Sequence, residues 1–375
     1  MEIREGSVEE ERGGMMVFAP DFWKGKKVLV TGHTGFKGSW LCLWLHSLGA
    51  EVTGYALPPV GDSNLFSLCG LETNMNSVIG DIRDYVLLER TVRENNPEII
   101  IHMAAQPLVR YGYEHPVLTY EVNVIGTINM MEAVRLAGSS VRALVIITTD
   151  KCYENREWAW GYREIDRLGG HDPYSNSKAC AELAVAAYRS SYYPPERYDT
   201  HQLSLATARA GNVIGGGDWS PDRIVPDIMR TLLAKKRLRI RNPEAIRPWQ
   251  HVLEPLHGYL LLAQAMVERG VDVAGGWNFG PSDNSTRNVK WLVESIIEKW
   301  GQEADFDSDE GPHPHEAAIL RLDSSKAQSQ LGWKPRWNVN QALELTVEWF
   351  RAYEAGAVIV DECNRQIKMY SESEI

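Results

Sequence analysis

The chain has 375 residues, of which 44% are apolar and 24% are charged, and its formal net charge at pH 7 is −11. This composition is typical of a globular protein with a sizeable core. The acidic balance argues against a general nucleic-acid binder, which needs basic surface to neutralise phosphates. No apolar run approaches the roughly 20 residues that cross a bilayer, and the acidic first residues lack the apolar segment of a secretory signal. We therefore expect a cytoplasmic protein that binds neither nucleic acid nor a membrane.

Short apolar runs alternate with helical patterns through the first two hundred residues. Amphipathic stretches such as 85–95 and 120–136 separate the apolar runs. Fully apolar strands joined by helices predict an α/β fold with a Rossmann-like, doubly wound parallel sheet, whose ligands sit at the carboxyl ends of the strands. Strands are expected at 26–32, 49–55, 77–81, 98–105, 142–150 and 204–209.

After Gly215 the pattern changes, because glycines, prolines and tryptophans become frequent and the apolar runs shorten. We expect a flexible extension at 1–20 and a dinucleotide-binding Rossmann domain at 21–210. A smaller C-terminal α/β domain that binds the substrate is expected at 211–355, with some interleaving of the two domains. The polar residues 356–375 are expected to form a peripheral tail.

The cysteine and histidine patterns indicate no metal site. Five cysteines are spread along the chain without a CxxC pair, which predicts reduced thiols. The HPH sequence at 313–315 offers two imidazoles, but no further ligands cluster near it, which favours a loop.

The sequence TGHTGFKG at 31–38 follows the first strand and opens a helix. Gly32, Gly35 and Gly38 allow a tight turn and a close approach of a diphosphate, which the N–H groups at the helix start then hold. His33 and Lys37 offer positive charge beside the pyrophosphate, and the alternative is that both are solvated loop residues. For Lys37, where a cation opposes the helix dipole, we favour a phosphate contact.

The ends of the second and third strands bear on the choice of dinucleotide. The second strand ends in GYALPP, without the acid that usually holds the ribose of NAD, which weakens the choice of NAD over NADP. Asp81, at the end of the third strand, is a candidate contact for adenine. It is also a candidate N-cap for the helix that follows, and the two roles can coexist.

The sequence DPYSNSKACAELAVAAY at 172–188 predicts a helix with Tyr174 and Lys178 on one face. Asp172 can cap this helix, and Pro173 suits its first turn. A phenol with a pKa of about 10 is a poor base at neutral pH, but a nearby ammonium and an oxidised nicotinamide favour the phenolate. Tyr174 can then take the proton of an alcohol while hydride leaves the carbon. The strand ending in TTD upstream argues against an incidental pair on a surface helix.

The sequence ITTDKCYE at 147–154 ends an apolar strand with Thr149, Asp150 and Lys151. One interpretation is a solvated turn. The other is an active site with an acid and a base within reach of one substrate. A plain dehydrogenase needs only Thr149, Tyr174, Lys178 and its cofactor, whereas a sugar dehydratase also needs the acid and the base.

Together these motifs resemble the extended short-chain dehydrogenase/reductase family. The resemblance covers about residues 24–350 and is carried by the glycine loop, HMAAQ at 102–106, NVIGT at 123–127, TTD and YSNSK. Within that family, GHTGFKGSW, TTDKCYEN, YSNSK, GNVIGGGDW and RPWQHVLEPL are similar to the CDP-glucose 4,6-dehydratase branch. The resemblance implies NAD as cofactor, the nucleotide sugar CDP-glucose as substrate, and a homodimer or homotetramer. A dimer would form through the helices around 120–137 and 174–190.

The resemblance also implies individual site residues. It places Thr149 beside Tyr174 at the sugar O4, lets Asn123 support Lys178 through backbone and water, and makes Arg247 grip the diphosphate unless it forms a surface salt bridge. The residues implied in NAD binding are Gly32, His33, Gly35, Phe36, Lys37, Gly38, Asp81, Ile82, Ala104, Ala105, Gln106, Asn123, Thr148, Tyr174 and Lys178. Those implied in substrate binding are Gln106, Thr149, Arg209, Asn212 and Arg247.

The implied reaction oxidises C4, eliminates water across C5 and C6, and returns the hydride to C6. Its catalytic set is Thr149, Asp150, Lys151, Tyr174 and Lys178. Asp150 would protonate the departing C6 hydroxyl. Lys151 takes the base position, where other 4,6-dehydratases carry glutamate, and a charged Lys151 would instead stabilise the enolate.

Two other functions stay open, and so does the role of one basic segment. The sequence is also compatible with another nucleotide-sugar 4,6-dehydratase or a 4-epimerase, which needs no acid at Asp150, and with a cofactor-binding regulatory protein whose site is silent. The basic run KKRLRIR at 235–241 is either a solvated strand edge or a patch that steers an anionic nucleotide sugar, and none of its residues is assigned to the site.

Overall fold

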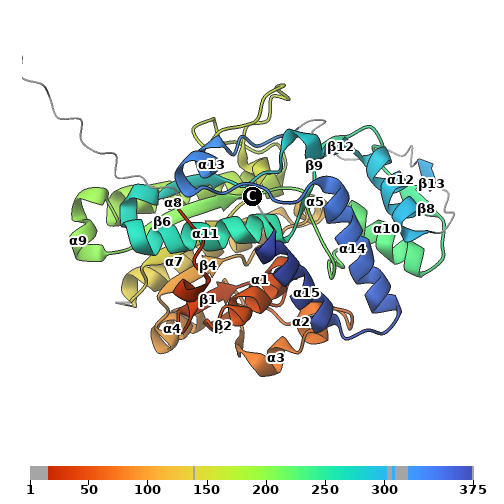
Figure 1. Cartoon of the computed structure of the whole chain (residues 1–375). Helices are drawn as coiled ribbons and strands as arrows, with labels where there is room; N and C mark the ends of the chain where they lie inside the picture. Colours follow the sequence, from red (N-terminus) through yellow and green to blue (C-terminus); the bar gives the residue numbers. More distant parts are fainter. Residues whose placement is uncertain (1–15, 138–139, 302–305, 309–319, 374–375) are drawn as a thin grey trace, which may run out of the picture.

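The computed structural model describes residues 16–137, 140–301, 306–308 and 320–373 and is built on a seven-stranded sheet (Figure 1). Neighbouring strands of this sheet are all parallel, in the order β11-β6-β5-β4-β1-β2-β3. The strands are β1 (Lys27–Thr31), β2 (Glu51–Ala56), β3 (Asn76–Ile79), β4 (Ile99–His102), β5 (Ala143–Ile147), β6 (Ser204–Arg209) and β11 (Gly275–Asn278). The Rossmann-like, doubly wound parallel sheet expected from the sequence is confirmed.

Helices connect the strands of the sheet and are the main regular elements of the second half of the chain. The α-helices are α1 (Phe36–Ser47), α2 (Leu65–Leu68), α3 (Leu71–Asn74), α4 (Tyr85–Asn95), α5 (Val109–Glu114), α6 (Pro116–Tyr120), α7 (Gly126–Leu136), α8 (Pro173–Tyr192), α9 (Tyr198–His201), α10 (Ile224–Leu233), α11 (Leu253–Arg269), α12 (Val289–Trp300), α13 (Ser325–Leu331), α14 (Val339–Glu354) and α15 (Ile359–Glu372). Short 3₁₀ or π segments are η1 (Pro20–Trp23), η2 (Glu121–Ile125), η3 (Asp150–Cys152), η4 (Pro195–Arg197), η5 (Gly270–Val273) and η6 (Asp283–Ser285).

Apolar residues on alternate positions of each strand fill two cores, one on each face of the sheet. On β1, Val28 and Val30 enter the core that includes α1 and α11, whereas Leu29 enters the core that includes α4, α7 and α8. Because both faces are covered by helices, the central strands β4 and β5 are buried at every position. Asp172 caps α8 by accepting a hydrogen bond from Ser175 N at 3.0 Å, and Pro173 occupies its first turn, as the sequence predicted.

The strand order reverses between β1 and β4. From β1 the chain runs outward to β2 and β3, then returns to the other side of β1 and adds β4, β5 and β6. In an open parallel sheet, such a reversal leaves a crevice at the carboxyl ends of the strands. The glycine loop after β1 and the polar segments after β4 and β5 therefore meet at one edge of the sheet.

The second half of the chain also contributes to the central sheet. Strand β11 pairs with β6, and α11 packs on β5 and β6, so the segment 211–355 interleaves with the first unit. Short strands form pairs outside the sheet, β10 with β7, β12 with β9 and β13 with β8, and β8, β12 and β13 lie near α10 and α12 to one side (Figure 1). Their bounds are β7 (Val213–Ile214), β8 (Leu238–Ile240), β9 (Ile246–Pro248), β10 (Gln250–His251), β12 (Thr286–Asn288) and β13 (Phe306–Ser308).

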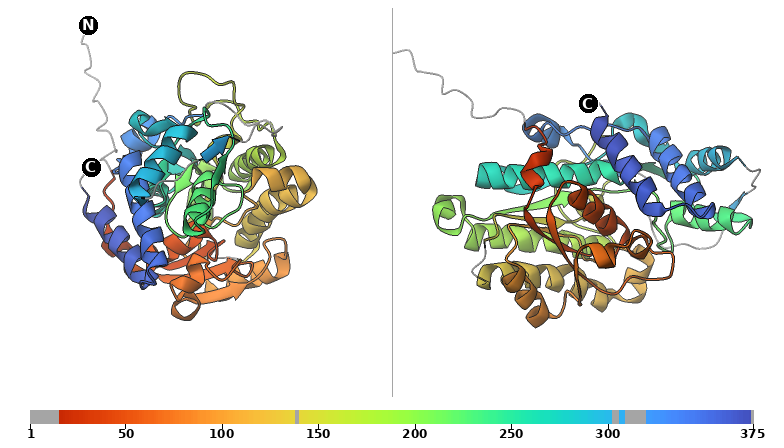
Figure 2. Two further views of the ribbon diagram at one scale, coloured as in Figure 1. Left: turned by 90° about the vertical axis from the view of Figure 1, so that its right-hand side faces the viewer. Right: turned by 60° about the horizontal axis from the view of Figure 1, so that its bottom comes forward.

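The last helix, α15, corrects the expectation of a peripheral tail at 356–375. It packs against α1 and α14, and the views agree that these helices lie side by side (Figures 1 and 2). Cys363, Ile367 and Tyr370 are buried, and Tyr370 Oη donates to Glu254 Oε2 of α11 at 2.7 Å. The apolar positions recur every three or four residues, which makes the segment an amphipathic helix despite its polar composition.

The extension expected at 1–20 lies outside the described residues up to residue 15. Beyond that point the chain is packed: Ala19 N donates to Gln264 Oε1 at 3.0 Å, and the Phe18 ring contacts Trp44 and His257. The HPH sequence at 313–315 also lies outside the described residues. Within the part of the chain that the structure describes, no helix is long and apolar enough to cross a membrane.

A pair of substitutions tests the docking of α15. Tyr370→Ala removes a fully buried ring and the hydroxyl that binds Glu254, so we expect the free energy of unfolding to fall by ~3–5 kcal/mol. Lys368→Ala removes only an exposed ion pair on the same helix and should change it by less than ~0.5 kcal/mol. Urea denaturation followed by circular dichroism measures both values, and equal losses in the two variants would contradict the docking role.

Candidate active site

The glycine loop after β1 is shaped by close backbone contacts. A Cβ on Gly38 would lie 2.1 Å from Gly32 O, and a Cβ on Gly32, where φ is 76°, would lie 2.9 Å from Ala104 N. Gly35 forms the N-cap of α1 without a side-chain hydrogen bond. The first N–H groups of α1 thus have no side-chain cap and lie directly after the loop that follows β1. This backbone cradle fits the diphosphate of a dinucleotide.

His33 does not carry the positive charge that the sequence suggested. Its ring is fully buried, its Nε2 lies 2.7 Å from Ser77 Oγ, and it packs edge-on against Phe66. Burial lowers the pKa of His33 to about 4, so the ring is neutral at pH 7. Its role in the structure is to fill the space above Gly54, where a Cβ would come within 2.3 Å of the imidazole.

Lys37, by contrast, reaches the cavity from the first turn of α1. Its Nζ lies 5.7 Å from the centre of the Tyr259 ring. Burial and the charges of Arg223 and Lys178 lower the pKa of Lys37 to about 7. An anion beside it would raise this pKa again, so the surroundings of Lys37 suit the phosphate contact expected for it.

Asp81 lies at the end of β3 and binds Arg83, with Arg83 Nη2 2.7 Å from Asp81 Oδ2. The N-cap of α4 is Asp84, which accepts a hydrogen bond from Leu87 N at 3.1 Å. The interpretation of Asp81 as the cap of that helix is therefore wrong. Ile82 follows Asp81 and packs against Gly126, where a Cβ would come within 2.6 Å of it.

The segment after β4 is held in place by buried side chains. Thr31 Oγ1 accepts hydrogen bonds from Met103 N and Ala104 N at 3.0 and 3.1 Å. Asn123 Oδ1 accepts one from Gln106 N at 2.8 Å, and Asn123 Nδ2 donates to Gln106 O at 3.0 Å. The backbone of 103–106 is thus fixed at the crevice from both sides.

The triad of Thr149, Tyr174 and Lys178 comes together at the carboxyl end of β5. Tyr174 forms a hydrogen bond with Thr149, and Lys178 Nζ donates to Ile147 O at 3.1 Å. Burial raises the pKa of Tyr174 to about 12, although the Thr149 hydrogen bond and the Arg223 charge oppose this shift. Burial likewise lowers the pKa of Lys178 to about 8. Burial, which spacing alone does not reveal, outweighs the effects of Thr149 and Arg223 on the phenol.

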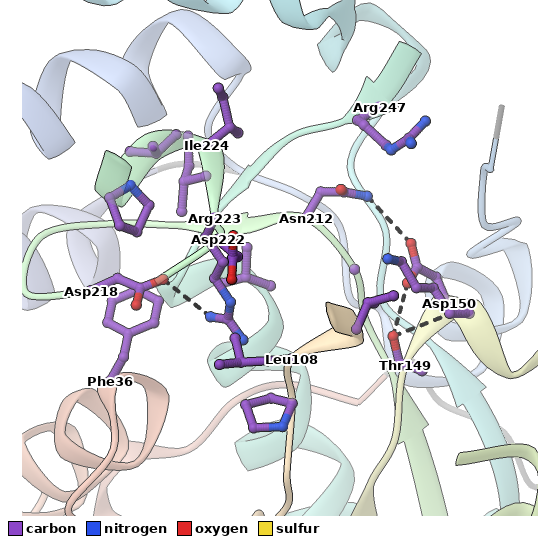
Figure 3. Close-up of a pocket in the computed structure, with 18 of the residues that line it drawn as sticks. Phe36, Leu108, Thr149, Asp150, Asn212, Asp218, Asp222, Arg223, Ile224 and Arg247 are labelled. Atoms are coloured by element: carbon purple, nitrogen blue, oxygen red, sulfur yellow. Dashed lines mark hydrogen bonds and ion pairs between the residues drawn. The ribbon is translucent and has the colours of Figure 1, made fainter. Parts of the chain in front are cut away.

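Asp150 and Lys151 lie beside this triad, on the first residues of η3. Asp150 is 2% exposed, and its two carboxylate oxygens accept hydrogen bonds from Thr149 Oγ1 at 2.9 Å and from Asn212 Nδ2 at 3.3 Å (Figure 3). A Cβ on Gly211 would lie 1.8 Å from Asp150 Oδ2, so the bare backbone at 211 makes room for the carboxylate. Lys151 lines the same cavity and is partly exposed.

One cavity of about 330 Å³ joins most of the predicted site. The predicted residues that line it are Phe36, Lys37, Ala105, Thr148, Thr149, Asp150, Lys151, Tyr174, Lys178, Asn212 and Arg247. The other predicted residues lie outside its lining in the described structure: Gly32, His33, Gly35, Gly38, Asp81, Ile82, Ala104, Gln106, Asn123 and Arg209. Apart from Arg209, these belong to the glycine loop, the end of β3, the segment after β4 and η2.

Arg209 does not contact the cavity as the sequence suggested. It is 4% exposed, its Nε and Nη2 donate to Glu182 at 2.9 and 2.7 Å, and its Nη1 donates to Tyr153 Oη at 2.6 Å. Its charge is neutralised inside the protein by Glu182. The predicted substrate contact is therefore wrong for Arg209.

Sequence analysis missed several charged residues of the cavity wall. They are Arg110, Asp218, Asp222, Arg223, Asp227, Arg239 and Arg241. Arg223 binds Asp218 at 3.1 Å, and Asp222 Oδ1 lies 3.4 Å from both Arg110 and Arg241 (Figure 3 shows the first pair). Arg239 and Arg241 are two residues apart in the basic run at 235–241, and this strand spacing puts their side chains on one face. No sequence motif marks the other charged residues of the wall.

Several known proteins are similar to this chain over most of its length. A model of the GDP-mannose 4,6 dehydratase family matches residues 29–346. The CDP-glucose 4,6-dehydratase of Salmonella typhimurium strain LT2 is 51% identical over 350 residues, which is 93% of this chain and 97% of that protein. DesIV, a dTDP-glucose 4,6-dehydratase from Streptomyces venezuelae with NAD and TYD bound, matches with a TM-score of 0.74 at 23% identity, covering 89% of this chain and 99% of its own. The UDP-glucose 4-epimerase of Thermus thermophilus in complex with NAD has a TM-score of 0.73 at 25% identity, with coverages of 86% and 98%.

Proposed function

The chain belongs to the GDP-mannose 4,6-dehydratase family. We propose that it converts CDP-glucose to CDP-4-keto-6-deoxyglucose with NAD as cofactor. The observation that carries the proposal is the Salmonella relative, whose likeness extends over nearly the whole length of both chains. The grouping of Thr149, Asp150, Lys151 and Tyr174 around one cavity supports it independently. The division into a cofactor domain at 21–210 and a substrate domain at about 211–355 is part of the same proposal.

The crevice between β1 and β4 is the proposed NAD site. The backbone of Gly32, Gly35 and Gly38 would hold the diphosphate, with Lys37 as a cationic contact, and Asp81 would lie at the adenosine end. The chain supplies the cradle for this cofactor even though β2 lacks a terminal acid. Bound there, NAD would supply the hydride acceptor for sugar carbon 4 and the hydride donor for carbon 6.

In the first half of the proposed reaction, Tyr174 takes the proton of the C4 hydroxyl while Thr149 holds that oxygen. Because burial raises the pKa of Tyr174 to about 12, the phenol needs nearby cations to ionise during turnover. Lys178, one turn further along α8, supplies one, and Arg223 of the opposite wall supplies another. Arg223 is thus proposed to assist the same proton transfer.

In the second half, Asp150 protonates the departing C6 hydroxyl and Lys151 acts at the C5 proton. Lys151 either removes this proton as a neutral amine or, when charged, stabilises the enolate. Asn212 and Thr149 fix the Asp150 carboxyl in one orientation, which suits transfer to a single oxygen. The proximity of this acid to Thr149 lets oxidation and elimination use one bound position of the sugar.

The charge of the cavity wall supports an anionic nucleotide substrate. Eight lysine and arginine side chains but four carboxylates line the cavity in the described part of the chain, although the whole chain carries a net charge of −11. Arg247 is largely buried at this wall, and we propose it as a diphosphate contact. Arg110 and Arg241 of the same wall each lie 3.4 Å from Asp222 Oδ1.

A homodimer or homotetramer is also proposed, as is a cytoplasmic location. The helical segments 120–137 and 174–190 carry the exposed apolar side chains of Ile125, Leu136 and Leu183, which support an interface there. Light scattering of the purified protein would give the mass of the particle in solution, and a monomer at micromolar concentration would contradict the proposal.

Five free cysteines are in keeping with a reducing compartment, which supports the proposed cytoplasmic location.

A 4-epimerase is the second candidate, because the Thermus epimerase shares the fold over most of both chains. An epimerase keeps the C6 oxygen and has no step that requires an acid at Asp150. The two candidates therefore differ in their product, not in their cofactor.

Incubation with CDP-glucose, with and without added NAD, tests the proposed function. We expect a 4-keto-6-deoxy product by mass spectrometry and NMR, without net accumulation of NADH, because each hydride is returned. UDP-glucose and dTDP-glucose serve as controls for the base and should react more slowly. A 4-epimer that retains its C6 oxygen would overturn the dehydratase proposal.

Asp150→Asn tests whether Asp150 acts in the elimination of water and not in the oxidation at C4. Asparagine retains hydrogen-bonding groups for Thr149 and Asn212 but cannot donate a carboxylic proton, so we expect elimination to slow by ~10²–10⁴-fold. Oxidation at C4 should persist and appear as transient NADH absorbance in a stopped-flow experiment. Asp166→Asn, an acid outside the cavity lining, is the matched control and should leave both rates unchanged. An equal loss of both steps in Asp150→Asn would contradict the assigned role.

A further inference from the structure

A buried ion pair lies directly behind the triad. Glu182, on α8, is 4% exposed, and its carboxylate accepts hydrogen bonds from buried donors. Thr148 Oγ1 donates to Glu182 Oε1 at 2.5 Å, and Thr207 Oγ1 donates to Oε2 at 2.7 Å. Arg209 closes the cluster with two hydrogen bonds to the same carboxylate, at 2.9 and 2.7 Å. One carboxylate thus ties α8 to the residue after β5 and to the end of β6.

The other side of the ion pair is equally well held. Arg209 Nη1 donates to Tyr153 Oη at 2.6 Å, and Tyr153 Oη donates to Asn278 Oδ1 of β11 at 2.8 Å. Burial alone would raise the pKa of Glu182, but the Arg209 charge and the three donors outweigh it and bring the pKa below its usual value. Glu182 is therefore charged throughout the neutral range.

Glu182 stands one helical turn beyond Lys178, so the two side chains share a face of α8. Both side chains are buried, and the Glu182 carboxylate acts on Lys178 against the effect of burial. The same carboxylate binds Thr148, which immediately precedes Thr149 in the chain. Glu182 therefore acts on Lys178 through its charge and on the residue before Thr149 through a hydrogen bond, without lining the cavity among the described residues.

We propose that Glu182 is a positioning residue for Lys178: clamped by Arg209 and two threonines, it keeps the Lys178 ammonium charged and fixed behind Tyr174. The part of this inference that concerns turnover rests on the proposed function. Glu182 itself touches neither substrate nor cofactor. Its effect passes through Lys178 and through the end of β5.

Four other titratable groups around Lys178 do not supply a negative charge. His102 on β4 is neutral, because burial lowers its pKa to about 3, and its Nδ1 lies 2.8 Å from Thr31 Oγ1. Cys152 on η3 is a neutral thiol, since burial raises its pKa far above the usual value. Lys37 on α1, whose pKa is lowered to about 7, supplies no negative charge. Tyr174, on α8 itself, is also neutral at pH 7 because burial raises its pKa to about 12.

The test replaces the ion pair by neutral groups of similar size. In Glu182→Gln/Arg209→Met, the new amide oxygen can accept from Thr148 and its NH₂ can donate to Thr207, so buried hydroxyls keep partners. Replacing a complete buried pair also avoids leaving an isolated charge, which favours folding of the variant. Glu182→Gln alone is the second variant, and circular dichroism verifies that each is folded.

The readout is the titration of Lys178 itself, followed by NMR of ¹³Cε-labelled lysine and assigned through the signal lost in Lys178→Met. We expect the midpoint, about 8 in the parent, to fall by about one pH unit in both variants, because the opposing carboxylate is gone. Thr207→Val removes one hydrogen bond to Glu182 but no charge, and should leave the midpoint unchanged. An unchanged or raised midpoint in the variants without Glu182 would overturn the proposal.

The pH profile of turnover gives a second, separate reading. In the pH profile of the rate of C4 oxidation, the alkaline limb should move to lower pH in the same two variants and stay in place in Thr207→Val. A purely structural role of Glu182 would lower the rate without moving this limb. If the parent does not turn over CDP-glucose, the proposed function fails, while the NMR titration still decides the role of Glu182. If the parent is active and both the limb and the midpoint stay unmoved, the role of Glu182 fails alone.

Discussion

The parallel direction of all seven strands is the constraint on which the rest of the molecule depends. It brings the ends of β1, β4 and β5 to one edge, where the chain must either leave backbone groups open or fill the space with polar side chains. The glycine loop uses the first solution, and Thr149 and Asp150 use the second. Residues more than a hundred positions apart in the sequence thereby share one small cavity.

Placing reactive groups at this edge also means burying charged side chains, which is unfavourable. Residues from both halves of the chain stabilise these buried charges. Lys178 binds the carbonyl at the end of β5, whereas Glu182 and Arg209 neutralise each other behind it. The second half of the chain supplies the opposite wall, from which Asn212 orients Asp150. The segment 211–355 therefore takes part in the candidate site, because its Asn212 orients the Asp150 carboxyl, which is the acid of the proposed reaction.

Local patterns in the sequence predicted those features that depend on neighbouring residues alone. These are the strand–glycine–helix motif and the start of α8 with Tyr174 and Lys178 on one face. They failed where a distant partner decides the state of a residue. His33 is neutral because Ser77 and Phe66 enclose it, and Arg209 faces inward because Glu182 binds it. Strand β11 was also missed, since its two glycines lower strand propensity; a Cβ on the second would lie 2.8 Å from the Arg209 guanidinium. The apolar residues of α15 recur with a helical period in the sequence, but the polar composition of the segment favoured a peripheral tail instead.

The position of α15 has a consequence for how the chain is made. This helix closes the core around α1, where the Trp44 ring meets that of Tyr370 edge-on at 5.6 Å, and α1 begins at the glycine loop. On the ribosome α1 emerges early, but the part of its apolar face that packs on α15 stays uncovered until this much later segment of the chain has been made. The core around α1 is therefore completed late in folding, and part of its aromatic surface stays exposed until α15 docks.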